Sequence, residues 1–268
     1  MVASPLPPAD GRPLRSAVRR GPRAAALPEY YRALERAYGP QGWWPGRSRF
    51  EVIIGAILTQ NVAWSNVEKA IHALRTSGLL EPGRMESTPA ERIARLIHPA
   101  GFYRQKARTL RAFLTDVAVA TGGNLERYLR LPLRTLRSRL LAIRGIGPET
   151  ADAILLYAAG RRVFVVDAYT RRILARHRLI RGDEPYEEVR RLLESSLPRS
   201  VRVYNEGHAL LVRVAREHCR KGSARCTGCP LEAHLPGPSA GAVDGVTADP
   251  ASRIGRVRKS GAPRRSAD

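Results

Sequence analysis

The chain has 268 residues, with 46 basic and 24 acidic side chains, a formal net charge of +22 and a pI near 11.2. Charge of this size predicts a polyanionic partner or an anionic surface and makes association with nucleic acid strongly salt-dependent. The absence of an apolar run long enough for a membrane span excludes an integral membrane protein.

Two segments of unusual composition flank the body of the chain. Residues 1–27 and 236–268 are rich in Pro, Gly, Ala, Ser and Arg, which predicts disordered basic tails that add non-specific nucleic-acid affinity. The first segment lacks a secretory apolar core, although its Arg-rich, acid-poor character also fits a transit peptide. The remaining stretch, roughly 200 residues, is long enough for two small lobes or one larger core.

Helix signals dominate this body. The apolar run Phe50–Leu58 predicts a buried helix, and Ser65 with Glu68 forms a capping box that predicts a helix start. Thr88, Pro89 and Glu91 repeat the start signal, and another helix is expected from about Arg104. Val163–Val166 is the only strand-like run and is too short to found a sheet, so the expected class is all-α.

The most specific pattern is a glycine turn between two helical stripes. One stripe comprises Leu133, Leu136, Leu140 and Ile143, and the other comprises Ala151, Ile154, Leu155 and Ala158. Between them, Gly145 and Gly147 permit a tight hairpin, and Pro148 suits the first position of the second helix. Backbone N–H groups at that helix start would seat a phosphate. Alone, the pattern also describes an ordinary αα-hairpin.

With Asp167 following the apolar stretch downstream, the arrangement resembles the helix-hairpin-helix DNA glycosylases of the endonuclease III superfamily over roughly residues 30–231. The resemblance implies two helical lobes. Residues 46–159 would form a six-helix lobe that ends in the hairpin, and residues 28–45 with 160–235 would form the other.

The resemblance also implies roles for the hairpin and the aspartate. Gly145, Gly147 and Thr150 would lie at the DNA backbone, and Asp167 would be the catalytic carboxylate. Asp is also favoured as an N-cap, so Asp167 has a purely structural alternative. The two roles are compatible, because a helix N-terminus keeps a carboxylate ionised.

Two further positions match family features. Gln60, in Leu-Thr-Gln-Asn, lies where the family inserts a side chain into the duplex, so its amide would fill the gap left by an extruded base. The alternative is a polar helix terminus. Lys106 matches a basic residue near the DNA backbone, although most surface lysines have no specific role.

Trp43-Trp44-Pro45 resembles a branch of the superfamily that includes a 3-methyladenine glycosylase. Trp44 and Pro45 would form a floor on which an extruded, positively charged alkylpurine stacks. Alternatively, both tryptophans anchor the N-terminal segment to the core. Glu149 stands where lyase-competent members carry a nucleophilic lysine, and a carboxylate cannot form a Schiff base. It would complement a cationic base or simply belong to an acidic first helical turn.

Cys219, Cys226 and Cys229 follow the Cys-x6-Cys-x2-Cys spacing with which endonuclease III begins its [4Fe–4S] loop. The fourth position is Leu235, with His234 beside it, and clusters of this type normally need four thiolates. We therefore expect a vestigial loop, supported by the helix that carries Leu210, Leu211, Val214 and Ala215, and no stoichiometric cluster. The alternatives are a weak metal site at the three cysteines and a working cluster with His234 as the fourth ligand.

The sequence thus predicts a cytoplasmic, nucleoid-associated, monomeric, monofunctional DNA N-glycosylase that acts on double-stranded DNA with damaged bases, an alkylated purine in particular. The chemistry would need no cofactor. Three alternatives stay open: a bifunctional glycosylase/lyase, a non-catalytic DNA-binding module, and an unrelated basic helical protein.

Overall fold

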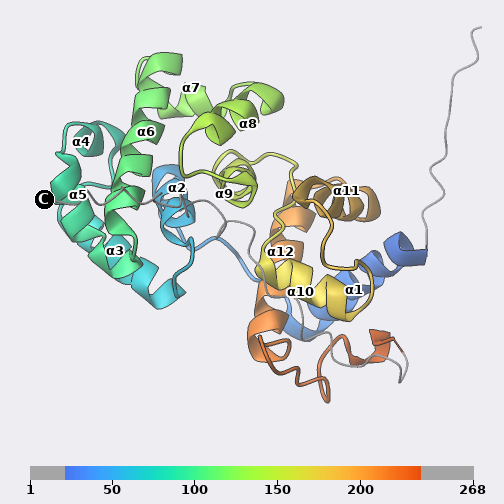
Figure 1. The fold of residues 1–268 in the computed structure, drawn as a ribbon. Helices are drawn as coiled ribbons and strands as arrows, with labels where there is room; N and C mark the ends of the chain where they lie inside the picture. Colours follow the sequence, from blue (N-terminus) through green and yellow to red (C-terminus); the bar gives the residue numbers. More distant parts are fainter. Residues whose placement is uncertain (1–21, 237–268) are drawn as a thin grey trace, which may run out of the picture.

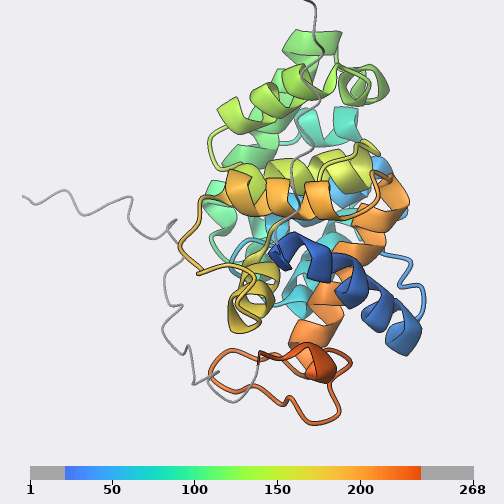
Figure 2. The ribbon, with the colours of Figure 1, turned by 90° about the vertical axis from the view of Figure 1, so that its right-hand side faces the viewer.

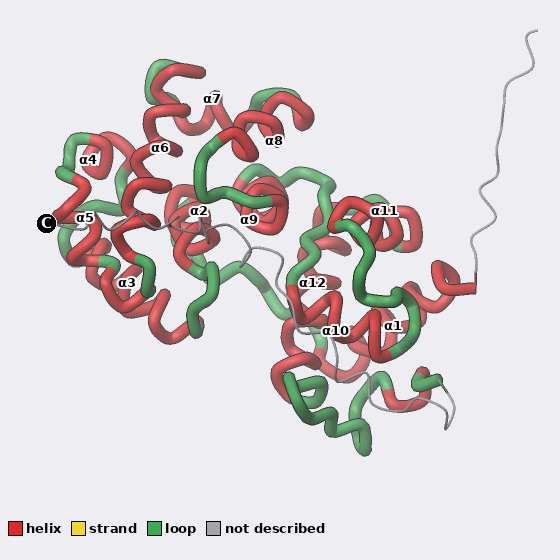
Figure 3. Tube along the Cα trace, viewed as in Figure 1, coloured by secondary structure: helices red, strands yellow, loops and turns green. Residues whose placement is uncertain are grey.

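The structure, a computed structural model, describes residues 22–236, and this part of the chain is helical and contains no β-strand (Figures 1 and 3). The expected all-α class is confirmed. None of the helices in the described range is long and apolar enough to cross a membrane.

Two groups of helices make up the molecule (Figure 1). The first contains α2 (Arg49–Leu58), α3 (Trp64–Thr76), α4 (Pro82–Glu86), α5 (Ala90–Leu96), η1 (His98–Ala100), α6 (Tyr103–Thr121), α7 (Leu125–Leu129), α8 (Leu133–Ala142), α9 (Pro148–Ala153) and the π-helical segment η2 (Ile154–Ala158). The second contains α1 (Pro22–Tyr38), α10 (Ala168–Arg176), α11 (Tyr186–Ser196), α12 (Val201–Glu217) and η3 (Glu232–His234). Helix α1 packs against α12, and the cysteine loop lies beyond the end of α12 (Figure 2).

Most helices begin close to the residues predicted from local sequence signals, but three predicted starts are wrong. Helix α1 begins at Pro22 and buries Leu27, so residues 22–27 do not belong to a disordered arm. The rest of the predicted tails lies outside the described residues. Helix α3 already starts at Trp64 without a side-chain cap, so the Ser65 capping box is wrong. Thr88 donates its hydroxyl to the Arg84 carbonyl and does not cap α5.

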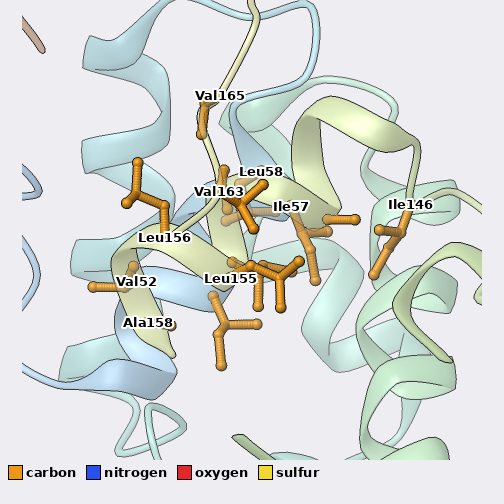
Figure 4. Close-up of a cluster of buried hydrophobic side chains, with 14 of the residues drawn as sticks. Val52, Ile57, Leu58, Ile146, Leu155, Leu156, Ala158, Val163 and Val165 are labelled. Carbon is orange, nitrogen blue, oxygen red and sulfur yellow. The ribbon is translucent and has the colours of Figure 1, made fainter. Parts of the chain in front are cut away.

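The strand-like run Val163–Val166 is buried but lies in no ladder within the described residues. As an extended segment, it contributes Val163 and Val165 to the buried cluster that also contains Leu155 of η2 and Leu58 of α2 (Figure 4). The segment therefore joins the hairpin lobe to α10 through the core. This buried connection fixes Asp167, the next residue, relative to the hairpin.

A buried ion network also links the two groups of helices. Asp152 of α9 is fully buried and accepts two bonds from Arg137 of α8, at 2.7 and 3.1 Å. Arg137 also donates to Glu187 of α11 at 2.6 Å, and Glu187 pairs with Arg190 at 2.7 Å. A buried charge is tolerated because it is paired in this way.

Candidate active site

The two hairpin glycines occupy different environments. Gly145 has φ +96°, and a Cβ added there would lie 2.2 Å from the Thr109 hydroxyl oxygen. Gly147 has φ −91° and open space around the position of a Cβ. Only Gly145 is therefore required by the geometry of the hairpin itself. Gly147 is exposed at the start of α9, where a missing side chain leaves the backbone accessible to a ligand.

Gln60 faces the hairpin. Its amide nitrogen donates to the Gly145 carbonyl at 2.9 Å and to the Thr150 hydroxyl at 2.8 Å. Thr150 is buried, so in this conformation it supports Gln60 and presents no surface to DNA. Insertion of Gln60 into a duplex stays a prediction, and it would require both of these bonds to break.

Lys106 lies inside the protein, only 3% exposed. Its ammonium donates to the carbonyls of Leu58, Gln60 and Ala100 at 2.9, 2.7 and 2.8 Å. Burial lowers the pKa of Lys106 to about 8, which leaves the ammonium the main form at neutral pH. The expected direct contact with DNA is not available to this side chain, and Lys106 instead ties the loop after α2 to the loop before α6.

An exposed aromatic follows the second of these loops, and the sequence analysis did not single it out. Phe102 is 69% exposed and has left-handed backbone (φ +44°). It lies two residues beyond Ala100, so the Lys106 ammonium holds its loop beside the Gln60 loop. Exposed apolar side chains on such loops are the type that wedges between base pairs. The sequence feature that could have identified Phe102 is a large apolar residue directly after a glycine.

Asp167 is both a helix cap and a partly accessible carboxylate. It is the N-cap of α10 and accepts a 2.7 Å bond from the Thr170 backbone N–H, so the capping role is present. Its other oxygen lies 3.5 Å from His208 Nε2, and its side chain is 12% exposed. Burial raises the pKa of Asp167, but His208 and the Thr170 bond outweigh that effect and hold the pKa below its usual value. The group is therefore a carboxylate at neutral pH.

Trp44 forms one wall of a hollow of about 410 Å³. The hollow is also lined by Pro45, Trp64 and the Glu51–Arg75 ion pair, whose atoms are 2.6 Å apart. The Trp44 ring lies 5.3 Å from that of Trp64 and 5.2 Å from that of Tyr157, measured between centroids. Trp44 therefore packs on the core and also borders a hollow, so the two roles considered for it are compatible.

Trp64 escaped the sequence analysis because its position at the start of α3 carries no local signal for a binding surface. A hollow of a few hundred Å³ with aromatic walls and a few charged groups has the size and lining of a small-molecule site. A nucleobase is a flat aromatic group that suits such walls.

The glycine hairpin, the buried extended segment and Asp167 all lie within residues 54–199. Residues 54–199 correspond to the HhH-GPD superfamily base excision DNA repair protein family, more than half of the chain. The chain belongs to the HhH-GPD superfamily. It is a base excision repair DNA glycosylase, as the sequence pattern indicated.

Individual relatives agree with this assignment. The HhH-GPD chain is 44% identical over 204 residues to a Methanocaldococcus jannaschii protein provisionally named as a DNA repair glycosylase, covering 75% of this chain and 92% of that protein. It is 28% identical over 186 residues to endonuclease III of Sulfolobus acidocaldarius, covering 69% and 80% of the two chains.

Solved structures show the same fold. The Helicobacter pylori 3-methyladenine DNA glycosylase bound to 1,N6-ethenoadenine superposes with a TM-score of 0.64 at 24% identity, covering 73% of this chain and 97% of that one. A trapped endonuclease III–DNA covalent intermediate gives a TM-score of 0.68 at 22% identity, covering 79% and 95%.

Glu149 is exposed on the first turn of α9 in this HhH-GPD protein. The whole chain contains only four lysines, at positions 69, 106, 221 and 259. Lys106 is committed to three carbonyls, Lys69 is exposed on α3, and Lys221 lies in the cysteine loop. None of the four belongs to the hairpin, to η2, to α10 or to α12, the elements around Asp167.

The cysteine loop does not provide the donor set of a four-thiolate cluster. Cys219, Cys226 and Cys229 line a small hollow of about 30 Å³, which Leu235, His177, His218 and Glu232 also line. The ring of His234 packs on Tyr30 at 4.9 Å and does not line this hollow. Within residues 22–236, no group of three or more Cys, His, Asp or Glu side chains is arranged to hold a metal ion. Three thiols and a leucine do not fit a [4Fe–4S] cluster.

Proposed function

We propose that this glycosylase is monofunctional: it releases a damaged base from double-stranded DNA by hydrolysis and leaves the abasic strand uncut. The observation that carries the proposal is that the chain has an ionised carboxylate, Asp167, but has Glu149 at the position of the lyase lysine. Such a carboxylate stabilises the positive charge that develops on the sugar as the glycosidic bond breaks, and it orients the attacking water.

The other parts of the site supply binding and extrusion. Backbone N–H groups at Gly147 and the start of α9 receive a phosphate, which positions the strand without reading its sequence. Phe102 wedges into the base stack beside the lesion, and the hollow beside Trp44 and Trp64 receives the extruded base. The enzyme acts as a monomer on chromosomal DNA in the cytoplasm, and its chemistry needs no metal.

The lesion class is the finer part of the proposal. Stacking against an indole ring that lines the hollow favours an electron-poor base, so an alkylated, positively charged purine is the proposed substrate. Two carboxylates at the hollow, Glu51 and Glu68, would complement a cationic base, although Arg47 and Arg75 also line it and Arg75 pairs with Glu51.

The test is a panel of duplexes that carry alkylated purines, oxidised bases, uracil or a mismatch, with base release and strand cleavage followed separately. We expect release of an alkylated purine, strands that break only after heat or alkali, and no covalent adduct after borohydride. Asp167→Asn should abolish release while binding to an uncleavable abasic analogue stays intact. Cleavage that keeps pace with base release, with a trapped adduct, would contradict monofunctional action. Faster release of another base would contradict the proposal that an alkylated purine is the substrate.

A further inference from the structure

His208 and Tyr157 form a buried polar pair directly behind Asp167. The Tyr157 hydroxyl lies 2.5 Å from His208 Nδ1, and His208 Nε2 lies 3.5 Å from the Asp167 carboxylate. The three side chains come from η2, α12 and α10, and α12 packs against both of the other elements. His208 is 6% exposed, so its ring nitrogens depend on protein partners.

One arrangement of protons gives the Tyr157 hydroxyl and both ring nitrogens of His208 a partner. Burial, followed by the nearby charges of Asp167 and Glu206, raises the pKa of Tyr157 well above its usual value, so its hydroxyl stays protonated. A protonated hydroxyl donates to His208 Nδ1, which places the ring proton on Nε2. Among the described residues, the charged group that approaches Nε2 is Asp167. With the proton on Nε2, the nearest acceptor is the Asp167 carboxylate at 3.5 Å, a distance that makes a charge contact but no well-formed hydrogen bond.

We infer that His208 is a positioning residue for Asp167 and that Tyr157 holds His208 in the required tautomer and orientation. The inference rests on the proposed role of Asp167. With Thr170 bonded to one carboxylate oxygen and His208 at the other, the carboxylate is fixed in one orientation, and its 12% exposed part remains for the sugar. The Tyr157 ring also contacts Trp44 at 5.2 Å, so the same chain of contacts joins the carboxylate to a wall of the hollow.

The pair also determines the acid limit of activity. The titratable groups that act on Asp167 or on its partners are His208 of α12, Tyr157 of η2, and Glu206 of α12, which acts on Tyr157. His208 lowers the pKa of Asp167, whereas burial raises it. Removing His208 leaves only the Thr170 bonds to oppose burial, so the carboxylate takes up its proton at a higher pH. The acid limb of the rate profile then moves to higher pH.

The experiment measures single-turnover base release against pH on the duplex that the panel identifies. His208→Leu should slow release by about 10- to 100-fold, the size of effect seen when a metal-ligating residue loses the partner that orients it. It should also move the acid limb to higher pH. His208→Gln keeps an N–H donor near the Nε2 position and should recover part of the rate. Tyr157→Phe should slow release while keeping the ring contact with Trp44. Binding to an uncleavable abasic analogue should change little in all three variants.

The chain offers a matched control. Tyr30 and His177 form a second tyrosine–histidine pair, with the hydroxyl 3.0 Å from Nδ1, in which neither residue contacts Asp167. His177→Leu should leave the rate and its pH profile unchanged once circular dichroism shows a folded protein. An unchanged rate and acid limb in His208→Leu, or equal losses in His208→Leu and His177→Leu, would overturn the inference. Activity in Asp167→Asn would instead overturn the proposed function.

Discussion

Gly145 and Gly147 look equivalent in the sequence, but single atoms distinguish them in the structure. The Thr109 hydroxyl fills the space that a Cβ on Gly145 would need, and that hydroxyl also donates to the Arg144 carbonyl at 3.1 Å. Gly147 faces open space with ordinary backbone angles. One glycine therefore shapes the hairpin, and the other leaves its backbone uncovered.

This difference predicts opposite outcomes for two alanine variants. Gly145→Ala combines a strained positive φ with a clash and should lower the free energy of unfolding by about 3 kcal/mol. Gly147→Ala should change stability by less than about 1 kcal/mol yet weaken DNA binding on the order of tenfold, equivalent to about 1.4 kcal/mol. Urea unfolding and fluorescence anisotropy with lesion-free duplexes measure the two effects. A folded Gly147→Ala protein with parental affinity would mean that no phosphate approaches this position.

At the scale of elements, Lys106 acts as a clamp between two loops. Its ammonium binds carbonyls at the end of α2, in the Gln60 loop and in η1, all of which would otherwise lose their partner inside the protein. Unsatisfied buried carbonyls are costly. The clamp therefore fixes the loops that carry Gln60 and Phe102.

Lys106→Met should consequently lower stability by about 3 kcal/mol, because the buried carbonyls are left without a donor. It should also slow base release from duplex DNA more than from single strands, since the wedge loops matter only where bases are paired. Lys69→Met is the control, because Lys69 is exposed on α3. Equal effects of the two variants on unfolding and on release would show that the clamp is dispensable.

Short-range patterns were enough to predict some of these elements. The apolar run at Phe50–Leu58, the glycine hairpin and the position of Asp167 all follow from local spacing, and each lies where it was expected. The partners of Asp167 do not follow from spacing, because His208 reaches it only through the packing of α12 on α10. The surface position predicted for Lys106 was wrong for a related reason. The buried position is stabilised by three carbonyls from other segments, and local sequence does not reveal these partners.

The structure also differs from the sequence prediction in the helix after the hairpin, which was expected to be a continuous α-helix. After Ala153 the backbone changes to the π-helical segment that contains Tyr157. Such segments are often found at functional sites, where the extra residue redirects a side chain. Here the segment carries the tyrosine that contacts both His208 and Trp44. Apolar periodicity alone does not distinguish a π-helical turn from an α-helical one.

At the scale of the whole molecule, the excess of positive charge is spread beyond the described fold. Ten of the 46 basic side chains lie outside residues 22–236, and the remaining 36 belong to the part that carries the hairpin and Asp167. Within the fold, several arginines are already paired, such as Arg137 and Arg190 in the network around Asp152. Paired arginines bind phosphate less readily, so the unpaired basic side chains dominate non-specific attachment to DNA.

Comparison of the full chain with a version limited to residues 22–236 tests where that attachment arises. The logarithm of the association constant for lesion-free duplex should fall linearly with the logarithm of salt concentration in both. The slope should be shallower in the shorter protein, by roughly 0.9 for each phosphate contact that is lost. Single-turnover base release at saturating enzyme should stay the same, because the shorter protein keeps Asp167, the hairpin and the hollow beside Trp44. Identical slopes would place all of the electrostatic attachment within the helical fold and assign none of it to the basic segments at the two ends.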